Sequence, residues 1–342
     1  MNIITEDQVY QALSNVIDPD LHEDIVTLGF IKELKIQDNN VSFTIELTTP
    51  ACPFKQKMRD EAEANIKNIP DVKNIDITLT AHANADNEMP QKVSVKGVKH
   101  VIAVASGKGG VGKSTVSANI ALALAQTGAK VGLLDADIYG PSIPLLLGVT
   151  DEQLHGTDEE IYPVEKYGVK VVSMGFLLPR EQAVIWRGPM LDKMVNQFLM
   201  NVVWGEIDYL VVDLPPGTGD VQLGLCQQVN ITGAIVVSTP QEAAWSIAQK
   251  AISMFRQLHT PILGLIENMS YYVCPHCDEK DYIFGIGGTK KLAEELRIDF
   301  LGEIPLSTDI RTFSDYGNPI VIAEPESCAT KAFKEIVKKL TA

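Results

Sequence analysis

Short, almost entirely apolar segments in the second part of the chain constrain its fold more than any other feature. They alternate with stretches of helical character and read VIAVAS (101–106), KVGLLDAD (130–137), DYLVVDLPPG (208–217), GAIVVSTP (233–240) and PILGLIENM (261–269). Strands that are apolar on both faces belong to parallel sheets covered by helices on both sides. We therefore predict an α/β fold with a doubly wound, mainly parallel sheet.

The first 80 residues follow a different pattern. Thr5 and Gln8 have the spacing of a capping box, and residues 41–47 alternate apolar and polar side chains as a half-buried strand does. We expect helices at 7–16 and 53–69 and strands at 31–36, 41–47 and 72–79. The order α-β-β-α-β predicts a small α+β domain.

Residues 81–97 separate these two patterns. Their sequence, AHANADNEMPQKVSVKG, contains few large apolar side chains, one proline and no clear period, as is typical of a linker. The sequence thus predicts a small α+β domain at 1–80, a linker at 81–97 and a P-loop α/β domain at 98–342.

Charge and hydropathy exclude several classes of partner. The net charge is −15, whereas binding to nucleic acid without sequence preference relies on clustered Lys and Arg, so we expect no nucleic-acid partner. No apolar run approaches the roughly 18 residues that a membrane span requires. The first residues also lack the basic and apolar regions of a signal peptide. We therefore expect no membrane partner and a cytoplasmic location.

A phosphate-binding pattern follows the first apolar segment. Gly107, Gly112, Lys113 and Ser114 complete G-x-x-x-x-G-K-[ST] between an expected strand and an expected helix. Backbone N–H groups of such a turn hold phosphate oxygens, while Lys113 would reach the β and γ phosphates of ATP and the Ser114 hydroxyl would bind Mg²⁺. The expected nucleotide-binding residues of this loop are Gly107, Gly109, Gly110, Val111, Gly112, Lys113, Ser114 and Thr115.

Acidic residues end two other expected strands. Asp137 follows the strand at 130–135, and Asp213 ends the strand at 208–213. Ligands of open α/β sheets bind at the carboxyl ends of the strands. We expect Asp213 to hold Mg²⁺ through water and Asp137 to orient an attacking water, and the alternative is that both are solvated strand ends. Pro215–Gly219 would then be a switch segment.

Cys274 and Cys277 form a C-x-x-C pair. Five cysteines do not suit a disulfide framework in a reducing compartment, so the pair is better interpreted as metal-binding or redox-active. A tetrahedral site needs four ligands and the chain offers no second pair, but a homodimer would supply them. The four thiolates could hold a [4Fe–4S] cluster or a zinc ion, and a redox dithiol is a third interpretation.

The loop sequence GKGGVGKST resembles the deviant Walker A motif of the MinD/ParA/nitrogenase iron protein class. That resemblance implies a nucleotide-sandwich homodimer in which Lys108 reaches the nucleotide of the other subunit. A second cation there would stabilise the charge that develops during phosphoryl transfer. The alternative is a solvated lysine. With Lys108, the expected catalytic residues are Lys108, Lys113, Asp137 and Asp213.

Several further motifs resemble the Mrp/ApbC family of iron-sulfur cluster carrier ATPases. These motifs are DADIYGPSIP, WRGPM, WGEIDYLVVDLPPGTGD, STPQEA, ENMSYYVCPHC and FLGEIPLSTDIR. The resemblance implies that Cys274 and Cys277 hold a labile cluster that bridges two subunits, and we expect a cluster of the [4Fe–4S] type. It also implies slow ATP hydrolysis tied to cluster transfer to acceptor apoproteins, with Asn268 at the adenine. Asp278, where the family often has glycine, is a visible departure.

The first domain resembles the MIP18-like (DUF59) domain, on the segments DPDLHEDIVTLGFI and TTPACPFKQKM. That resemblance implies iron-sulfur assembly factors as partners. Cys52 lies in a turn before an expected helix, whose N-terminus would lower the pKa of a thiol. Cys52 would then contact a metal or cluster transiently, and simple packing under the turn is the alternative.

A second function class remains open at this point. A MinD/ParA-like spatial regulatory ATPase with a structural zinc at the cysteine pair would also carry these motifs. Its support is the tail AFKEIVKKLTA, in which apolar residues share one helix face beside three lysines, as in a surface-binding helix. The alternative for this tail is a helix docked on the sheet.

Overall fold

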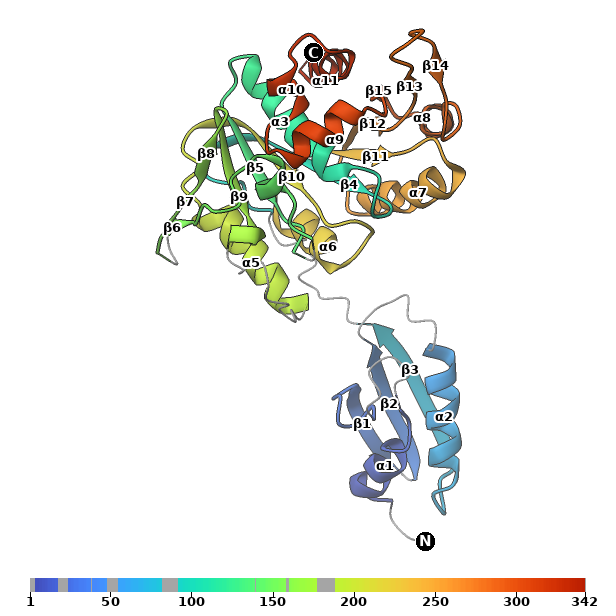
Figure 1. The fold of residues 1–342 in the computed structure, drawn as a ribbon. Coiled ribbons are helices and arrows are strands. Elements are labelled where there is room, and N and C mark those ends of the chain that lie inside the picture. The colour runs from blue at the N-terminus through green and yellow to red at the C-terminus, as the bar shows by residue number, and fades with distance from the viewer. Residues whose placement is uncertain are drawn as a thin grey trace. The chain divides into compact units, whose positions relative to one another are not determined.

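The structure, a computed structural model, describes residues 4–17, 24–37, 39–47, 55–81, 92–138, 140–157, 160–176 and 188–341 (Figure 1). The chain divides into two compact units, Met1–Met89 and Pro90–Ala342. The division falls within the segment 81–97, of which residues 82–91 lie outside the described residues. Each unit is described separately.

The small unit has the order predicted from its sequence. Its elements are α1 (Glu6–Leu13), β1 (Ile31–Gln37), β2 (Asn40–Leu47), α2 (Lys55–Lys67) and β3 (Asn74–Ala81). The sheet order is β1-β2-β3, with β1 antiparallel and β3 parallel to β2. Val9 and Leu13 of α1 and Met58 and Ile66 of α2 are buried in one apolar core with the sheet. The small α+β domain is therefore confirmed.

Helix α1 begins as predicted and ends earlier. The backbone N–H of Thr5 donates to Gln8 Oε1 at 3.1 Å, as a capping box requires. The helix was expected to reach Val16 but ends at Leu13. Asn15 Nδ2 donates to the Gln11 carbonyl at 3.3 Å, and the Asn15 N–H donates to the Ala12 carbonyl instead of that of Gln11. Side chains that compete for helix carbonyls in this way favour helix ends.

The large unit is built on an eight-stranded sheet in the order β15-β12-β11-β4-β10-β5-β9-β8. The strands are β4 (Val98–Ser106), β5 (Val131–Asp135), β8 (Val164–Lys166), β9 (Val169–Ser173), β10 (Ile207–Asp213), β11 (Gly233–Ser238), β12 (Ile262–Glu267) and β15 (Phe300–Glu303). All neighbours are parallel except β8, which runs antiparallel to β9. The predicted mainly parallel sheet is therefore confirmed.

Helices cover both faces of this sheet (Figure 1). One apolar cluster contains side chains of α5 (Gly188–Asn201), α6 (Asp220–Gln228), α7 (Glu242–Gln257) and α8 (Gly288–Leu296). The other contains side chains of α3 (Lys113–Gln126), α4 (Ile143–Leu146), α9 (Thr308–Asp315), α10 (Ile320–Ala323) and α11 (Cys328–Leu340). Shorter pieces are β6 (His155–Gly156), β7 (Ile161–Tyr162), the 3₁₀ turn Met174–Phe176, β13 (Tyr272–Val273) and β14 (Lys280–Asp281).

The C-terminal helix α11 is docked on the sheet. Phe333, Ile336 and Val337 are buried among residues of α3 and the strands. The apolar face of the tail is therefore occupied within the chain itself. This finding removes the sequence feature that favoured a surface-binding helix.

Candidate functional site

The phosphate-binding loop lies between β4 and α3, where glycine is required at two positions. A Cβ on Gly107 would stand 2.5 Å from the backbone nitrogen of Ala248 in α7. Gly112 has φ +80° and faces the Asn268 side chain so closely that a Cβ would collide with it. Gly107 is therefore needed for close approach to α7, whereas Gly112 is needed both for close approach and for its φ, which L-residues with side chains rarely adopt.

Lys113 forms a buried ion pair with Asp213. Lys113 Nζ lies 2.7 Å from Asp213 Oδ1, and the two side chains are 6% and 0% exposed. Ser117 Oγ donates to the same carboxylate oxygen at 2.7 Å, and Lys113 Nζ donates to Ser114 Oγ at 3.2 Å. The sheet order explains this meeting, since β4 and β10 are adjacent. The two motifs, far apart in sequence, therefore share one site.

The second oxygen of Asp213 has the properties of a magnesium partner. Asp213 Oδ2 is buried and has no hydrogen-bond partner among the described residues. Mg²⁺ prefers oxygen ligands and keeps several waters, and Lys113 Nζ contacts both the Asp213 carboxylate and the Ser114 hydroxyl, so the two oxygen groups suit a site with a water-mediated contact. A buried oxygen without a partner lowers the stability of the fold unless an ion or a water satisfies it. The residues present therefore fit Mg²⁺.

Asp135 holds the loop that carries Asp137. Its Oδ1 accepts from the Asp137 N–H at 3.1 Å, while Oδ2 accepts from the Ile143 N–H at 3.1 Å and from Ser173 Oγ at 2.9 Å. Burial, and then the charge of Asp213, raises the pKa of Asp135 to about 8. The sequence pattern alone indicates no role for Asp135. Its neighbour Asp137 is buried, and its Oδ1 accepts from the Gly140 N–H at 3.3 Å.

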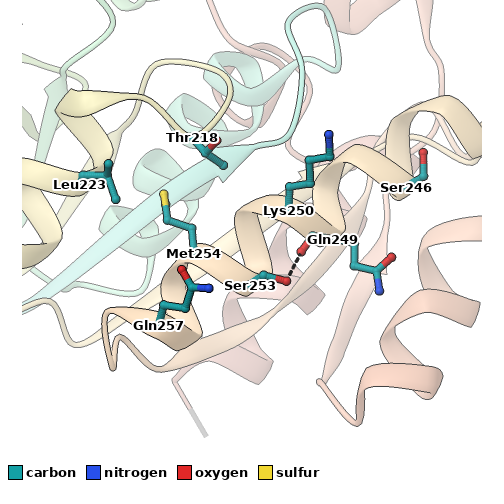
Figure 2. A pocket seen from close by; sticks show the side chains of 8 residues that line it. All are labelled: Thr218, Leu223, Ser246, Gln249, Lys250, Ser253, Met254 and Gln257. Atoms are coloured by element: carbon teal, nitrogen blue, oxygen red, sulfur yellow. Dashed lines mark hydrogen bonds between the residues drawn. The ribbon is translucent and has the colours of Figure 1, made fainter. Parts of the chain in front are cut away.

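The segment Pro215–Gly219 is hydrogen-bonded to the end of β4, the strand that precedes the phosphate-binding loop. The Gly217 N–H donates to the Ser106 carbonyl at 2.9 Å, and Gln222 Nε2 donates to the Pro215 carbonyl at 2.7 Å. In Figure 2, Thr218 and Leu223 face the side of α7 that carries Lys250 and Met254. A groove of about 540 Å³ lies there, lined by Thr218, Leu223, Ser246, Gln249, Lys250, Ser253, Met254 and Gln257.

A pocket beside the loop suits the nucleoside part of a nucleotide. It has a volume of about 270 Å³ and is lined by Gly112, Thr115, Leu146, Asn268, Met269, Pro305, Leu306, Ser307, Ile310, Arg311, Ser314 and Asp315. Asn268 Nδ2 donates to the Val111 carbonyl at 2.8 Å, which fixes the amide at the pocket wall. Asn268 was expected at the nucleotide from the sequence, whereas the pocket residues from 305 to 315 were not. The segment FLGEIPLSTDIR, which contains several of these pocket residues, could have indicated them, but it was used only for the family resemblance.

Cys274 and Cys277 lie at the tip of a small hairpin formed by β13 and β14. The Cys274 N–H donates to the Glu279 carbonyl at 3.0 Å, and the Asp278 N–H donates to the Cys274 carbonyl at 2.9 Å. Asp278 has φ +56°, a conformation that favours glycine and that aspartate tolerates better than most residues. Asp278 therefore preserves the turn at a position where glycine is common in the family that the sequence resembles.

The two thiols are accessible and one of them is activated. Cys274 is half-buried and Cys277 is exposed. The backbone N–H groups of His276 and Cys277 hold the pKa of the Cys274 thiol below its usual value. In the described part of the chain, no group of three or more Cys, His, Asp or Glu side chains could hold a metal. The hairpin therefore offers thiolate ligands for only part of a tetrahedral site.

The remaining cysteines differ in their surroundings. Cys226 is buried in the core, and burial raises the pKa of its thiol to about 11. Cys328 is exposed at the first position of α11. Cys52 lies outside the described residues. Lys108 is half-buried, and its carbonyl accepts from Ser106 Oγ at 3.0 Å.

Residues 267–270 lie between the nucleotide loop and the cysteine hairpin, and Glu267 anchors them. This buried carboxylate ends β12, and its Oε1 accepts from Ser270 Oγ at 2.7 Å while its Oε2 accepts from the Thr289 N–H at 2.8 Å. Asn268, the next residue, is bonded to the loop carbonyl of Val111. Residues 267–270 therefore touch both the phosphate-binding loop and the start of the hairpin.

None of the helices in the described ranges has the length and apolar character needed to cross a membrane.

Known proteins share both parts of this chain. Residues 97–341 match the family described as NUBPL iron-transfer P-loop NTPase, and residues 6–77 match the family described as iron-sulfur cluster assembly protein. An iron-sulfur cluster carrier protein of Synechocystis is 45% identical over 343 residues, covering 99% of this chain and 97% of the relative. The iron-sulfur cluster transfer protein NUBPL of Dictyostelium discoideum is 44% identical over 299 residues, covering 86% and 91%.

Solved structures match the large unit. A nucleotide-binding protein of Archaeoglobus fulgidus in complex with ADP is 44% identical, with a TM-score of 0.61 over 70% of this chain and 93% of that one. The cell division ATPase MinD of Pyrococcus furiosus is 24% identical, with a TM-score of 0.54 over 71% and 98%. At that identity, the match to MinD shows a shared fold alone.

Proposed function

This chain belongs to the family of NUBPL iron-transfer P-loop NTPases, and on that premise we propose that it is an ATP-dependent iron-sulfur cluster carrier. The observation that carries the proposal is the physical link between its two sites. A nucleotide loop and a thiol hairpin are joined through residues 267–270, so that a change at one site can reach the other. The nucleotide acts as a switch and the cluster is the cargo.

In the nucleotide site, this chain's residues act mainly by positioning. Loop N–H groups and Lys113 bind the phosphates, and Asp137 orients the attacking water. Ser114 would bind Mg²⁺ directly and the unpartnered oxygen of Asp213 would bind it through water, and the ion would neutralise charge on the phosphates. When the nucleotide binds, the Lys113 ammonium, which lies 2.7 Å from Asp213 Oδ1 in the free chain, turns toward the γ phosphate. Hydrolysis is slow, and its catalysis relies on positioning and charge, with little covalent chemistry by the protein.

The cysteine hairpin binds the cargo. Cys274 and Cys277 supply two thiolates, and the same pair from a second copy completes a site for a [4Fe–4S] cluster. Lys108 reaches the nucleotide of that second copy. Thiolate-bound clusters need a reducing compartment, which supports the cytoplasm as the location. Acceptor apoproteins and iron-sulfur assembly factors are the partners, and Cys52 is a transient contact for the cluster.

The spatial regulatory function is not favoured. MinD proteins match this chain at an identity that shows only the fold, whereas relatives of 44–45% identity carry the names of cluster carriers or transfer proteins. The C-terminal helix, which could have bound a surface, is docked on the sheet. The cluster-carrier function therefore fits both units of the chain.

The test is anaerobic reconstitution with iron and sulfide, followed by measurement of iron and acid-labile sulfide per chain. About two irons and two sulfides per chain are expected for a four-iron cluster shared by a dimer. Cys277→Ser should lose both, whereas Cys328→Ser, which removes an exposed thiol on α11, should keep both. A colourless protein with about half a zinc ion per chain would contradict the carrier function.

A further inference from the structure

Exposed apolar side chains lie directly beside the cysteine hairpin. Tyr282, Ile283 and Ile286 follow β14 and are 38%, 54% and 76% exposed. We call Tyr282–Ile286 the apolar loop. Exposed side chains of this size that gather next to a functional group mark an interaction site more often than scattered ones do.

The backbone of the apolar loop is held in place from both ends. The Gly285 N–H donates to the Tyr282 carbonyl at 3.0 Å, which closes a turn. Gly285 and Gly287 have φ +99° and +63°, so Ile286 stands between two left-handed glycines. Beyond them, the start of α8 is anchored by the bond from the Thr289 N–H to buried Glu267. The outward position of Ile286 therefore follows from defined backbone geometry.

Ring contacts join the apolar loop to the hairpin. The Tyr282 ring lies edge-on to the Tyr271 ring, with centroids 6.5 Å apart. Lys280 of β14 places its Nζ 3.9 Å from the centroid of the Tyr271 ring. The Tyr272–Val273 strand, which leads to Cys274, starts one residue after Tyr271. The apolar loop and the two thiols therefore belong to one surface.

We propose that the apolar loop packs against a second copy of this chain and forms an apolar wall around the shared cluster. This inference rests on the proposed function. Cys274 and Cys277 supply two of the four ligands, and the described residues supply no further metal-holding group. When two copies share the site through a two-fold axis, the segments beside both hairpins face each other. The residues beside this hairpin are those of the apolar loop.

Charge explains why the contact must be apolar. Each copy carries a net charge of −15, and the hairpin itself contains Asp278, Glu279 and Asp281. Like charges therefore meet when two hairpins approach. Lys280, the cation within the hairpin, lies against the Tyr271 ring. Burial of Ile283 and Ile286 from both copies offsets this repulsion and excludes water from the thiolates.

The test compares the double variant Ile283→Asn/Ile286→Asn with Tyr162→Asn. Tyr162 is 49% exposed in β7, which lies beside the β8 edge of the sheet, whereas the hairpin lies near the β15 edge (Figure 1). Both variants alter exposed side chains and should fold as the wild type does. Full-length proteins are reconstituted with iron and sulfide, and the dimer dissociation constant is measured by anaerobic sedimentation.

We expect the double variant to weaken the dimer about tenfold or more and to lose iron to a ferrous chelator about tenfold faster, with Tyr162→Asn unchanged. Unchanged dimerisation and iron retention in the double variant would overturn the inference. So would a double variant that keeps the dimer and the cluster but transfers it more slowly to an apo-ferredoxin, because the loop would then serve the acceptor. A wild type that binds no iron would instead overturn the proposed function.

Discussion

The nucleotide loop and the cysteine hairpin of this chain are built in opposite ways. Lys113 and Asp213 are buried and paired at 2.7 Å, and Asn268 is bonded to the loop, so the nucleotide loop is largely satisfied within one chain. Cys274 and Cys277 lie on an exposed hairpin with no further metal-holding group among the described residues. A reaction site needs enclosure, whereas a site that releases its cargo needs access.

Lys113→Ala gives the largest expected difference between the two sites. ATP hydrolysis should fall by about 10²–10³-fold, because a preorganised cation near the transferred phosphoryl group is lost. Iron content after reconstitution should remain as in the wild type. Initial rates of phosphate release and iron per chain check both statements.

The matched control is Lys99→Ala. Lys99 Nζ and Asp208 Oδ1 are also 2.7 Å apart, but this pair is exposed on the surface. Surface pairs contribute little, so hydrolysis should be unchanged. Equal losses of activity in both variants would mean that burial of the Lys113–Asp213 pair does not matter, and the contrast between enclosed and open sites would fail.

Cys274→Ser tests the contrast between the enclosed nucleotide site and the exposed cysteine hairpin by changing the hairpin. Iron bound after reconstitution should fall at least about tenfold, because a thiolate ligand is removed from each copy. The affinity for a fluorescent ATP analogue should stay within about twofold, since the pair lies outside the pocket beside the loop. A variant that lost nucleotide binding instead would show that the hairpin supports the nucleotide site.

Glu267→Ala sharpens the comparison at the link between the sites. The change leaves the Ser270 hydroxyl and the Thr289 N–H without their buried acceptor, which should lower the free energy of unfolding by about 2–3 kcal/mol. Urea unfolding measures this loss. The control Glu295→Ala, on the exposed side of α8, should leave the midpoint unchanged. If Glu267→Ala left the free energy of unfolding unchanged, residues 267–270 would not hold the two sites together.

The smallest expected effect concerns pH. The pKa of Asp135 is about 8 in the folded chain and about 3.9 when unfolded, so the folded state keeps a proton that the unfolded state releases. Stability therefore falls as pH rises from about 4 to about 8. Without Mg²⁺ and nucleotide, we expect a loss of about 1 kcal/mol between pH 6 and 7. Asp135→Asn should flatten this dependence, and an equal slope in both proteins would contradict it.

Local spacing was sufficient to predict the chemistry-bearing segments. The loop pattern, the cysteine pair and the capping box each depend on residues a few positions apart, and the apolar runs predicted the parallel sheet. Helix α1 ended earlier than predicted because the Asn15 side chain donates to the Gln11 carbonyl, the acceptor that the Asn15 N–H would use in a longer helix. Asp135 was missed because its role depends on Ser173 and Ile143, which the chain brings to it only when folded.

By itself, the sequence determined which segments form strands, which turn binds phosphate and which residues can be metal ligands, because these properties follow from side chains that are neighbours in the chain. The tertiary structure decided which of them meet. The order of the strands places β10 beside β4 and brings Asp213 to Lys113. It also docked α11, closed the pocket with residues 305–315 and left Ile283 and Ile286 exposed beside the thiols. Such contacts join residues far apart in sequence, and no local pattern records them.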